Sequence, residues 1–445
     1  MTSEIPSGAG RRAKTGTRTE ADTIVAIATP SGAGAVGIVR LSGPASGRIL
    51  AELTGRLPKP RSATVLGVGD GTGRLLDRGL VLYFPAPNSY TGEDVVELHL
   101  HGGPRLLELV LEACQRHGAR LAEPGEFTRR AFLNGKLDLV AAEAVADLIA
   151  AESAGEVYVA ARQLEGRFRA VVEEAKGALL EVLSGLFAAA DYPDDVAFEA
   201  QAIWPKLEAV RRHLAAVLED GRRGRVVREG VEVVLAVPPN AGKSSLFNAL
   251  VGYERAIVTA IPGTTRDTVR EVLERGGIRF RFVDTAGLRH AEDPVEAEGV
   301  RRTREAVETA DMVLWVAEAT ARDPEVAEEV RRRPHLVVAQ KGDLVAKPPP
   351  WAEVVVSAKE GWGVEELWAR LLAAFPRPGD VPTTNQRHLA LLREAEALLR
   401  FRGDEPLDVV LSAVEAALDA LMRLTGEAAS EAILAEIFSR FCLGK

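Results

Sequence analysis

Short apolar runs separated by glycine and proline dominate residues 22–120. TIVAIAT, GIVRLSG, GLVLYF and DVVELHLHG have the composition of strands, and a helix-like stretch lies near 104–117. This pattern predicts a small α+β domain over 22–123. The preceding residues, 1–21, carry basic side chains without an apolar core, which predicts a disordered tail and argues against a secretory signal.

Helical periodicity follows over about 126–219, where alanine, leucine and charged residues recur at helical spacing. DYPDD at 191–195 interrupts this pattern and predicts a bend or a helix end. An alanine-rich helical pattern returns over 385–445. Together the two stretches predict one helical domain made from two halves, 124–220 and 378–445.

Strand and helix patterns alternate between the two helical halves. VEVVLAV, IRFRFVDT, DMVLWVAEA, LVVAQKGD and EVVVSAK read as strands, while GVRRTREAVETA and VEELWARLLAAF read as helices. Such alternation is typical of a mostly parallel sheet wrapped by helices. Because GRRGRVVREG (221–230) and PRPGDVP (376–382) read as linkers, we expect an α/β domain over 221–377 that is inserted into the helical domain.

The stretch VEVVLAVPPNAGKSSLFNAL, residues 231–250, places Gly-Lys-Ser between an apolar strand and an apolar helix. These three residues alone also fit an ordinary helix start, but the context is the one that a phosphate-binding loop requires. Backbone N–H groups would face phosphate oxygens, Lys243 would reach the outer phosphates, and Ser244 would bind Mg²⁺. Val237 stands where the motif has glycine, and valine resists positive φ. We therefore expect nucleotide binding to be retained but loosened.

Three further segments follow in the order of a GTPase. PGTTRD offers Thr265 as a second magnesium ligand, and VDTAG offers Asp284 to orient the metal and Gly287 to sense the outer phosphate. QKGD offers Asp343, whose carboxylate can accept two hydrogen bonds that guanine donates and adenine does not. Each segment alone also fits a turn, but in this order at strand ends they predict a P-loop GTPase domain. The residues assigned to the nucleotide are Asn240, Ala241, Gly242, Lys243, Ser244, Ser245, Thr259, Ala260, Ile261, Pro262, Gly263, Thr264, Thr265, Asp284, Thr285, Ala286, Gly287, Gln340, Lys341, Asp343, Ser357, Ala358 and Lys359.

Two positions depart from the common GTPase pattern. Gln340 stands where guanine-binding loops carry asparagine, and its extra methylene is expected to misplace the amide contacts. Leu288 follows the DxxG glycine, where small GTPases commonly place a glutamine that orients the attacking water. Another group must then assist hydrolysis. Glu296 or a cation can serve, although from spacing alone Glu296 reads more simply as a solvated loop carboxylate.

Length and composition add limits to this picture. A chain of 445 residues predicts several domains, and 47% hydrophobic with 27% charged residues is typical of a soluble protein. The sequence has no run of about 18 apolar residues, so no membrane span is expected. Cys114 and Cys442 cannot form a disulfide framework or a four-cysteine metal site, which favours a cytoplasmic location. The formal net charge of −9 argues against broad, non-specific coating of nucleic acid.

Beyond the GTPase motifs, the chain resembles the MnmE (TrmE) family of tRNA modification GTPases. The likeness covers nearly all of residues 22–445 and is carried by DTIVAIATPSGAGAVGIVRLSGP, NSYTGEDVVELHLHGGP, PGEFTRRAFLNGKLDLVAAEAVADLI, PNAGKSSLFNAL, TAIPGTTRDTV, DTAGLR and FCLGK. The resemblance implies a multidomain fold with an N-terminal α+β folate-binding domain, an α-helical domain and an inserted G domain. It also implies a homodimer formed through the N-terminal domains.

The same resemblance implies a reaction and its partners. With an FAD-dependent partner, MnmG (GidA), the family adds an aminomethyl-type (carboxymethylaminomethyl) group to the wobble uridine of certain tRNAs within a heterotetramer. A tetrahydrofolate, such as 5-formyltetrahydrofolate, supplies the carbon. Arg40, Glu97, Lys136 and Lys445 match the folate contacts. Without the family they read as a strand-end arginine, a strand-face glutamate and exposed lysines.

The family's G domains pair through K⁺, which offsets transition-state charge as an arginine finger does elsewhere. Glu296 matches the glutamate that orients the water and would act catalytically with Lys243. The potassium ligands and their loop match Asn240, Thr259, Ala260, Ile261 and Thr264.

Three positions and one cysteine leave alternatives open. Val237, Pro238 and Gln340 replace the family's usual glycine, arginine and asparagine. These departures keep open a second reading, a weakly GTP-binding scaffold that holds folate, tRNA and the partner. A ribosome-assembly GTPase is a third reading, which the motifs outside the G domain argue against. For Cys442, a buried thiol near a helix end explains the residue as well as a catalytic role.

Overall fold

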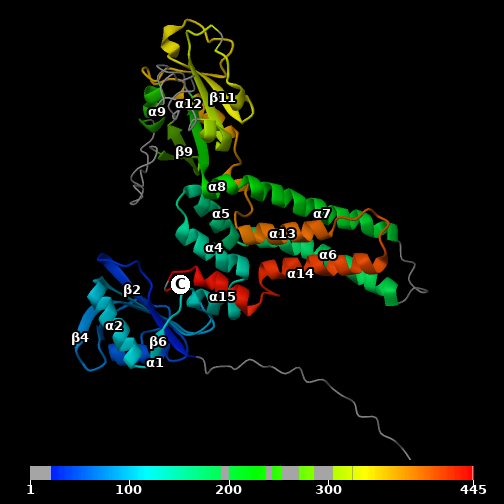
Figure 1. Ribbon diagram of the computed structural model, residues 1–445. Coiled ribbons are helices and arrows are strands. Elements are labelled where there is room, and N and C mark those ends of the chain that lie inside the picture. Colours follow the sequence, from blue (N-terminus) through cyan, green and yellow to red (C-terminus); the bar gives the residue numbers. More distant parts are fainter. Residues whose placement is uncertain are drawn as a thin grey trace, which may run out of the picture. The chain divides into compact units, whose positions relative to one another are not determined.

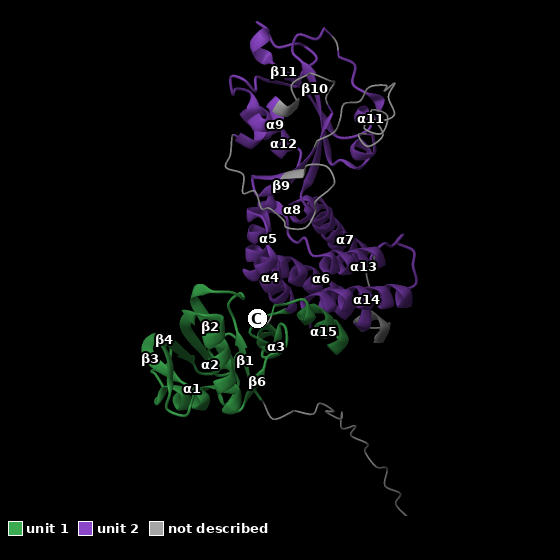
Figure 2. Cartoon of the chain, turned by 60° about the vertical axis from the view of Figure 1, so that its left-hand side comes forward, with its two compact units in different colours: residues 1–138, 430–445 green, residues 139–429 purple. Residues whose placement is uncertain are grey.

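The computed structural model describes residues 22–191, 200–236, 243–252, 270–284, 304–322, 324–442 and 444–445. Figure 1 shows these elements along the chain. The chain divides into two compact units, which Figure 2 distinguishes by colour. Unit 1 comprises residues 1–138 and 430–445, and unit 2 comprises residues 139–429. The predicted tail at 1–21 lies outside the described residues.

Unit 1 is built on a six-stranded sheet in the order β3-β4-β5-β2-β1-β6. Its pairs are antiparallel except for β1 with β6. Alternation along the strands sends Val39, Leu41 and Leu98 to one face, where they pack with two helices. The strands are β1 (Thr23–Ile27), β2 (Gly34–Ser42), β3 (Thr64–Gly69), β4 (Leu75–Phe84), β5 (Val95–Gly102) and β6 (Ala119–Leu121), and the helices are α1 (Ser46–Thr54) and α2 (Pro104–Arg116).

Two further helices complete unit 1, α3 (Glu126–Leu133) and α15 (Glu431–Ser439). Their approach is close at Gly125, where φ is +69° and a Cβ would lie 2.6 Å from the Phe438 carbonyl oxygen. The Phe132 and Phe438 rings are in tilted contact, with centroids 6.4 Å apart and an interplanar angle of 42°. The Phe127 N–H donates to the Lys445 carbonyl oxygen at 3.2 Å. The segment 430–445 is therefore an integral part of unit 1.

The helical part of unit 2 buries an aliphatic core that includes Phe168, Leu179, Leu214, Leu392 and Leu421. The long helices α6, α7, α13 and α14 lie side by side around this core (Figure 1). Helix α6 is described as far as Asp191, and most of the predicted bend or helix end at 191–195 lies outside the described residues. The helices are α4 (Leu139–Ala150), α5 (Ala154–Leu164), α6 (Arg167–Asp191), α7 (Ala200–Arg223), α8 (Arg225–Glu229), α13 (Gln386–Leu398) and α14 (Leu407–Thr425).

The G domain of unit 2 has a sheet in the order β12-β11-β10-β7-β9-β8. Its pairs are parallel apart from the β8–β9 hairpin, as the alternating strand and helix pattern predicts. Helices α9 and α12 cover one face, where Trp368 meets Phe280 and Phe282. The elements are β7 (Val231–Ala236), α9 (Lys243–Gly252), β8 (Arg270–Arg275), β9 (Ile278–Asp284), β10 (Met312–Glu318), α11 (Glu328–Arg331), β11 (His335–Gln340), η1 (Gly342–Leu344), β12 (Val354–Val356), α12 (Val364–Ala373) and, after it, η2 (Pro378–Asp380).

Two sequence expectations concern segments rather than domains. The predicted linker at 221–230 is largely helical, because it contains the end of α7 and all of α8. Within the described residues, every helix is too short or too polar to cross a membrane.

Candidate functional site

The carboxyl ends of the parallel strands lie at one edge of the G-domain sheet. The register pairs Leu235 of β7 with Asp284 of β9, and Glu318 of β10 with Gln340 of β11. Ligands of open α/β sheets bind at this edge. The segments predicted to hold the nucleotide therefore start from a common edge.

Much of the predicted phosphate site lies outside the described residues. This holds for the side chains of Lys243, Ser244 and Asp284, whose backbones open α9 and close β9. Ser245 is exposed in the first turn of α9. Also outside the description lie Val237, Pro238, Asn240, Ala241, Gly242, residues 259–265, Thr285, Ala286, Gly287, Leu288 and Glu296.

The predicted base-binding loop is described, and Asp343 and Ser357 meet in it. The buried Ser357 hydroxyl donates to Asp343 Oδ1 at 2.6 Å. This hydrogen bond holds the pKa of Asp343 below its ordinary value, so the carboxylate stays ionised. A carboxylate fixed by a buried hydroxyl is a well-oriented acceptor for the N–H groups of guanine.

Lysines flank this carboxylate. Lys341 has a φ of +60°, and its ammonium lies 2.7 Å from Glu318 Oε1. Lys359 is 80% exposed and lies 3.4 Å from the Glu360 carboxylate. Sequence reasoning missed Glu318, which is in register with Gln340. Its position near the end of the strand-like run DMVLWVAEA is a signal that could have identified it.

Gln340 is 2% exposed, and its Oε1 atom has no hydrogen-bond partner among the described residues. A buried amide oxygen without a donor carries a desolvation penalty. Gln340 ends β11, one position before the loop that carries Asp343. The buried oxygen without a partner therefore lies beside the predicted base site.

The predicted folate contacts Arg40 and Glu97 face each other in unit 1. They are register partners on β2 and β5, and Arg40 Nε donates to Glu97 Oε1 at 2.9 Å. His99 bonds the other carboxylate oxygen through Nε2 at 3.0 Å. Burial alone would raise the pKa of Glu97, but the His99 hydrogen bond and the Arg40 charge outweigh it and lower the pKa. Glu97 therefore stays ionised.

The segment at 444–445 contacts the Arg40–Glu97 pair from one side. Arg40 Nη1 donates to the Gly444 carbonyl oxygen at 3.2 Å. Gly444 has a φ of +88°, and a Cβ there would lie 2.5 Å from the Ile27 carbonyl oxygen. Burial, with the Arg40 charge, lowers the pKa of the half-buried Lys445. The structure thus brings together three of the four predicted contacts, while Lys136 is exposed and donates to the Pro87 carbonyl at 3.1 Å.

Sequence reasoning missed three residues around Arg40. The guanidinium lies 5.7 Å from the ring centroids of both Tyr90 and Phe127. His99 was detectable, because strand alternation in ELHLH puts it on the same face as Glu97. An ionised carboxylate and a guanidinium beside aromatic rings suit a planar heterocycle that carries N–H donors.

The two cysteines differ in environment. Cys114 is buried in α2, and this burial raises the pKa of its thiol to about 12. Cys442 is exposed, so the expectation of a buried thiol is wrong. The neighbouring Phe441 takes the buried place against Gly125 instead.

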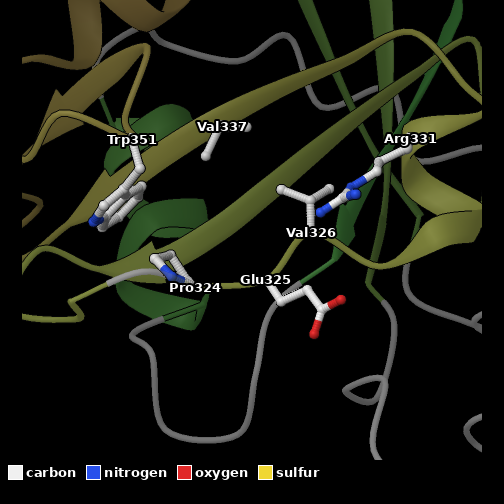
Figure 3. A pocket seen from close by; sticks show the side chains of 6 residues that line it. All are labelled: Pro324, Glu325, Val326, Arg331, Val337 and Trp351. Atoms are coloured by element: carbon white, nitrogen blue, oxygen red, sulfur yellow. The ribbon is translucent and has the colours of Figure 1, made fainter.

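A separate hollow of about 430 Å³ lies on the G domain beside β11 (Figure 3). The predicted site residues are not among those that line it. In the described part of the chain its lining is Pro324, Glu325, Val326, Arg331, Val337 and Trp351.

Comparisons with known proteins match both units. The family model "GTP-binding protein TrmE N-terminus" matches residues 23–136, and "MnmE helical domain" matches residues 139–442. The tRNA modification GTPase MnmE of Nitrosomonas europaea is 44% identical over 451 residues, covering 96% of this chain and 100% of its own. The same-named protein of Thiobacillus denitrificans is 44% identical over 437 residues, covering 95% and 98%.

A partial likeness to solved structures involves a crystal structure of Aquifex aeolicus Era bound to GDP·AlF₄⁻. It is 25% identical and covers 39% of this chain and 68% of that chain, with a TM-score of 0.28. This score is too low to bear on function.

The matches span the N-terminal and helical parts and run through the inserted G domain. The predicted fold class, a multidomain chain with an α+β domain, a helical domain and a P-loop GTPase domain, is confirmed. The chain belongs to the MnmE family and is a GTPase that acts in tRNA modification.

Proposed function

We propose that this GTPase is activated by K⁺ and, with the FAD-dependent MnmG (GidA) partner, adds a carboxymethylaminomethyl-type group to the wobble uridine of certain tRNAs. The chain works as a homodimer within a heterotetramer in the cytoplasm. A tetrahydrofolate, such as 5-formyltetrahydrofolate, donates the carbon. The observation that supports the proposal best is the Arg40–Glu97 pair, which Gly444 closes at 3.2 Å.

The Arg40–Glu97 pair fits the recognition of a folate ring. Glu97 is ionised, with Arg40 on one carboxylate oxygen and His99 on the other, and its remaining lone pairs can accept N–H groups. Arg40 can pair with an oxygen of the ring edge, and Tyr90 offers an aromatic surface beside it. Lys445 supplies positive charge for the folate carboxylates. Lys136, whose ammonium donates to the Pro87 carbonyl oxygen, supplies a second positive charge.

In the G domain, the Asp343 carboxylate selects guanine, and the Ser357 hydroxyl orients this carboxylate. Lys243 would neutralise the phosphates, and Ser244 and Thr265 would hold Mg²⁺, which would stabilise negative charge on the transferred phosphoryl group. K⁺ would be held by Asn240, Thr259, Ile261 and Thr264. Glu296 would orient the attacking water, since Leu288 has no polar group.

The test is nucleoside analysis of tRNA from cells in which Arg40→Ala replaces the parent chain. We expect the wobble modification to be lost and 5-formyltetrahydrofolate binding, measured by calorimetry, to be lost with it. GTP turnover should stay within about threefold of the parent, because removing a charged hydrogen-bonding group acts locally. Arg48→Ala is the matched control, because Arg48 also pairs with a glutamate in unit 1 but is 56% exposed on α1. Unchanged folate affinity in Arg40→Ala would refute the site.

The scaffold alternative is favoured by one observation, the buried Gln340 Oε1, which has no partner within the described part of the chain. A scaffold would bind guanine nucleotides weakly and still support modification. Modification that persists when GTP turnover is abolished by Lys243→Ala would favour this alternative.

A further inference from the structure

The β8–β9 hairpin of the G domain contacts the start of α5 in the helical part of unit 2. The Ala154 N–H donates to Glu274 Oε1 at 2.9 Å, and Arg279 Nη2 lies 2.6 Å from Glu156 Oε1. Arg279 Nη1 also donates to Glu152. We call this contact the hairpin dock; it comprises Glu152, Gly155 and Glu156 on one side and Glu274, Gly277 and Arg279 on the other.

The backbones in the hairpin dock fit closely. A Cβ on Gly155 would lie 2.0 Å from the Gly277 carbonyl oxygen and 3.0 Å from Pro378 Cγ. Gly277 has a φ of +79°, and a Cβ there would lie 3.0 Å from the Gly155 nitrogen. Such an approach between two elements requires that neither position carries a side chain. The dock is therefore a fitted contact and differs from a pair of surface charges that happen to meet.

The hairpin dock also contributes to the capping of α5. The Glu156 side chain completes a capping box with Ser153, while its other oxygen accepts from Arg279. Glu274 accepts from Ala154, whose N–H belongs to the first turn and has no partner within the helix. A displacement of the hairpin would thus remove donors and acceptors from the α5 terminus.

The other end of the hairpin adjoins the predicted nucleotide segments. β8 begins at Arg270, shortly after the segment that carries Thr265, and β9 ends at Asp284, directly before residues 285–287. The two strands are paired along their whole length, from Arg270 with Val283 to Arg275 with Ile278. A ladder bonded in this way moves as one element, so a shift at its nucleotide end is carried to its turn.

We propose that the hairpin dock couples the nucleotide state of the G domain to the N-terminus of α5, and that Arg279 is a positioning residue for the tRNA modification reaction. Arg279 carries the coupling because it bonds two of the three carboxylates of the dock, those of Glu152 and Glu156, and its side chain is only 19% exposed. This inference rests on the proposed function, since it assumes that GTP turnover drives modification.

The direct test is hydrogen exchange of the full chain, nucleotide-free and with GDP·AlF₄⁻, Mg²⁺ and K⁺. In the parent we expect exchange of the amides 154–158 to change by about fivefold or more on nucleotide binding, the lower range of coupling between sites. In Arg279→Ala this response disappears, while the amides 272–282 of the hairpin still respond. A parent without a response at 154–158, or an Arg279→Ala chain that keeps it, would overturn the proposal.

The matched control is Arg275→Ala on the same hairpin. Arg275 is 16% exposed and lies 2.6 Å from Glu365, a residue of α12 inside the G domain. Its removal breaks an ion pair inside the G domain and leaves Arg279 with Glu152 and Glu156 in place, so the response at 154–158 should persist. Equal loss in both variants would show a general effect on hairpin stability and would overturn the specific role of Arg279.

A second pair of variants guards against misfolding. Arg279→Glu should uncouple modification from GTP turnover, with turnover within about threefold of the parent and modification reduced about tenfold or more. Combining it with Glu152→Arg should restore part of the modification, which a merely structural loss would not allow. If the parent itself turns over GTP without modifying tRNA, the proposed function fails, while the exchange measurements still decide the dock.

Discussion

At the scale of single residues, the predicted base-binding segment QKGD (340–343) holds two side chains that differ in their hydrogen bonding. Asp343 receives a hydrogen bond from Ser357, whereas the buried Oε1 of Gln340 receives none from the described residues. An unsatisfied buried acceptor costs about 1–3 kcal/mol, and a misplaced amide also loses contacts to the ligand. We therefore expect Asp343 to contribute strongly to guanine recognition and Gln340 to contribute weakly.

Gln340→Asn should therefore tighten GDP binding by about 1 kcal/mol, or roughly fivefold. Titration with a fluorescent GDP analogue measures the change. Gln163→Asn is the matched control, because Gln163 is 1% exposed and its Oε1 also lacks a partner in the described structure, but it lies on α5. If Gln340→Asn binds no better than the parent, the surroundings have adapted to glutamine.

Asp343→Asn should change which base is accepted. The asparagine amide puts a donor where guanine also donates, so GTP affinity should fall by about 2 kcal/mol, the scale of a hydrogen bond to a charged group. Xanthine carries a carbonyl where guanine has its 2-amino group, so XTP affinity should rise. A ratio of GTP to XTP affinity that stays at the parent value contradicts the assignment of Asp343.

At the scale of elements, the docking of α15 against α3 depends on Gly125. Gly125→Ala combines a φ of +69° with a Cβ that would lie 2.6 Å from the Phe438 carbonyl oxygen, so α15 and the segment at 444–445 must shift. We expect about 2 kcal/mol of lost stability and weaker 5-formyltetrahydrofolate binding by calorimetry.

Gly135→Ala is the control for this prediction. Gly135 has the same φ of +69°, but no described atom lies within 4 Å of the place that its Cβ would take. The strain of the left-handed backbone alone should cost about 1 kcal/mol and leave folate binding unchanged. If Gly125→Ala and Gly135→Ala bind folate with equal affinity, the packing of α15 against α3 does not affect the folate site.

A buried carboxylate ties α4 to α13. Glu143 accepts from Arg387 Nε and from His388 Nε2, both at 2.7 Å. Burial alone would raise the pKa of Glu143, but the His388 charge and the Arg387 hydrogen bond outweigh it and lower the pKa from 4.5 to about 2. Because the folded pKa is below the ordinary value, the stabilisation is complete above pH 4.5 and is lost as pH falls toward 2.

Glu143→Gln should lower the free energy of unfolding by about 3 kcal/mol at pH 7, since it leaves the Arg387 guanidinium without its anionic partner. Thermal unfolding at about pH 7 and about pH 3.5 should show a smaller difference between variant and parent at the lower pH. Glu415→Gln, at an exposed position of α14, is the control and should match the parent at both values. A difference that grows on acidification contradicts the assignment.

The elements also show where sequence reasoning reaches its limit. Alternation and helical spacing located four of the six strands in the sheet of unit 1, five of the six in the G-domain sheet, and the long helices, because those patterns are local. The strands β3, β6 and β8 were not predicted. The strand order is not local: β6 pairs with β1 across about a hundred residues, and nothing in ARL indicates this partner. For the same reason Arg40 and Glu97 could be paired only through the family resemblance, and the contact of Arg40 with Gly444 was not foreseen.

At the scale of the whole molecule, GTP hydrolysis should depend on the monovalent cation. Leu288 offers no polar group to the water, so turnover should be much faster in K⁺ than in Na⁺ at matched ionic strength. Glu296→Ala should slow turnover by about 100-fold with little change in GTP affinity, because a water-orienting group acts mainly in the transition state. Steady-state phosphate release in the two salts measures both effects, and equal rates in K⁺ and Na⁺ would contradict the potassium role.

The contact between Arg40 and Gly444 joins residues 404 positions apart. During synthesis, Arg40 leaves the ribosome long before Gly444 is made, and the helical and GTPase parts are translated in between. Contacts of such long sequence separation form late, because loop closure must precede them. The Arg40–Glu97 pair in unit 1 therefore lacks its contact with Gly444 until residues 430–445 have been made, so a chain interrupted within the GTPase part can fold its first sheet and still lack this contact.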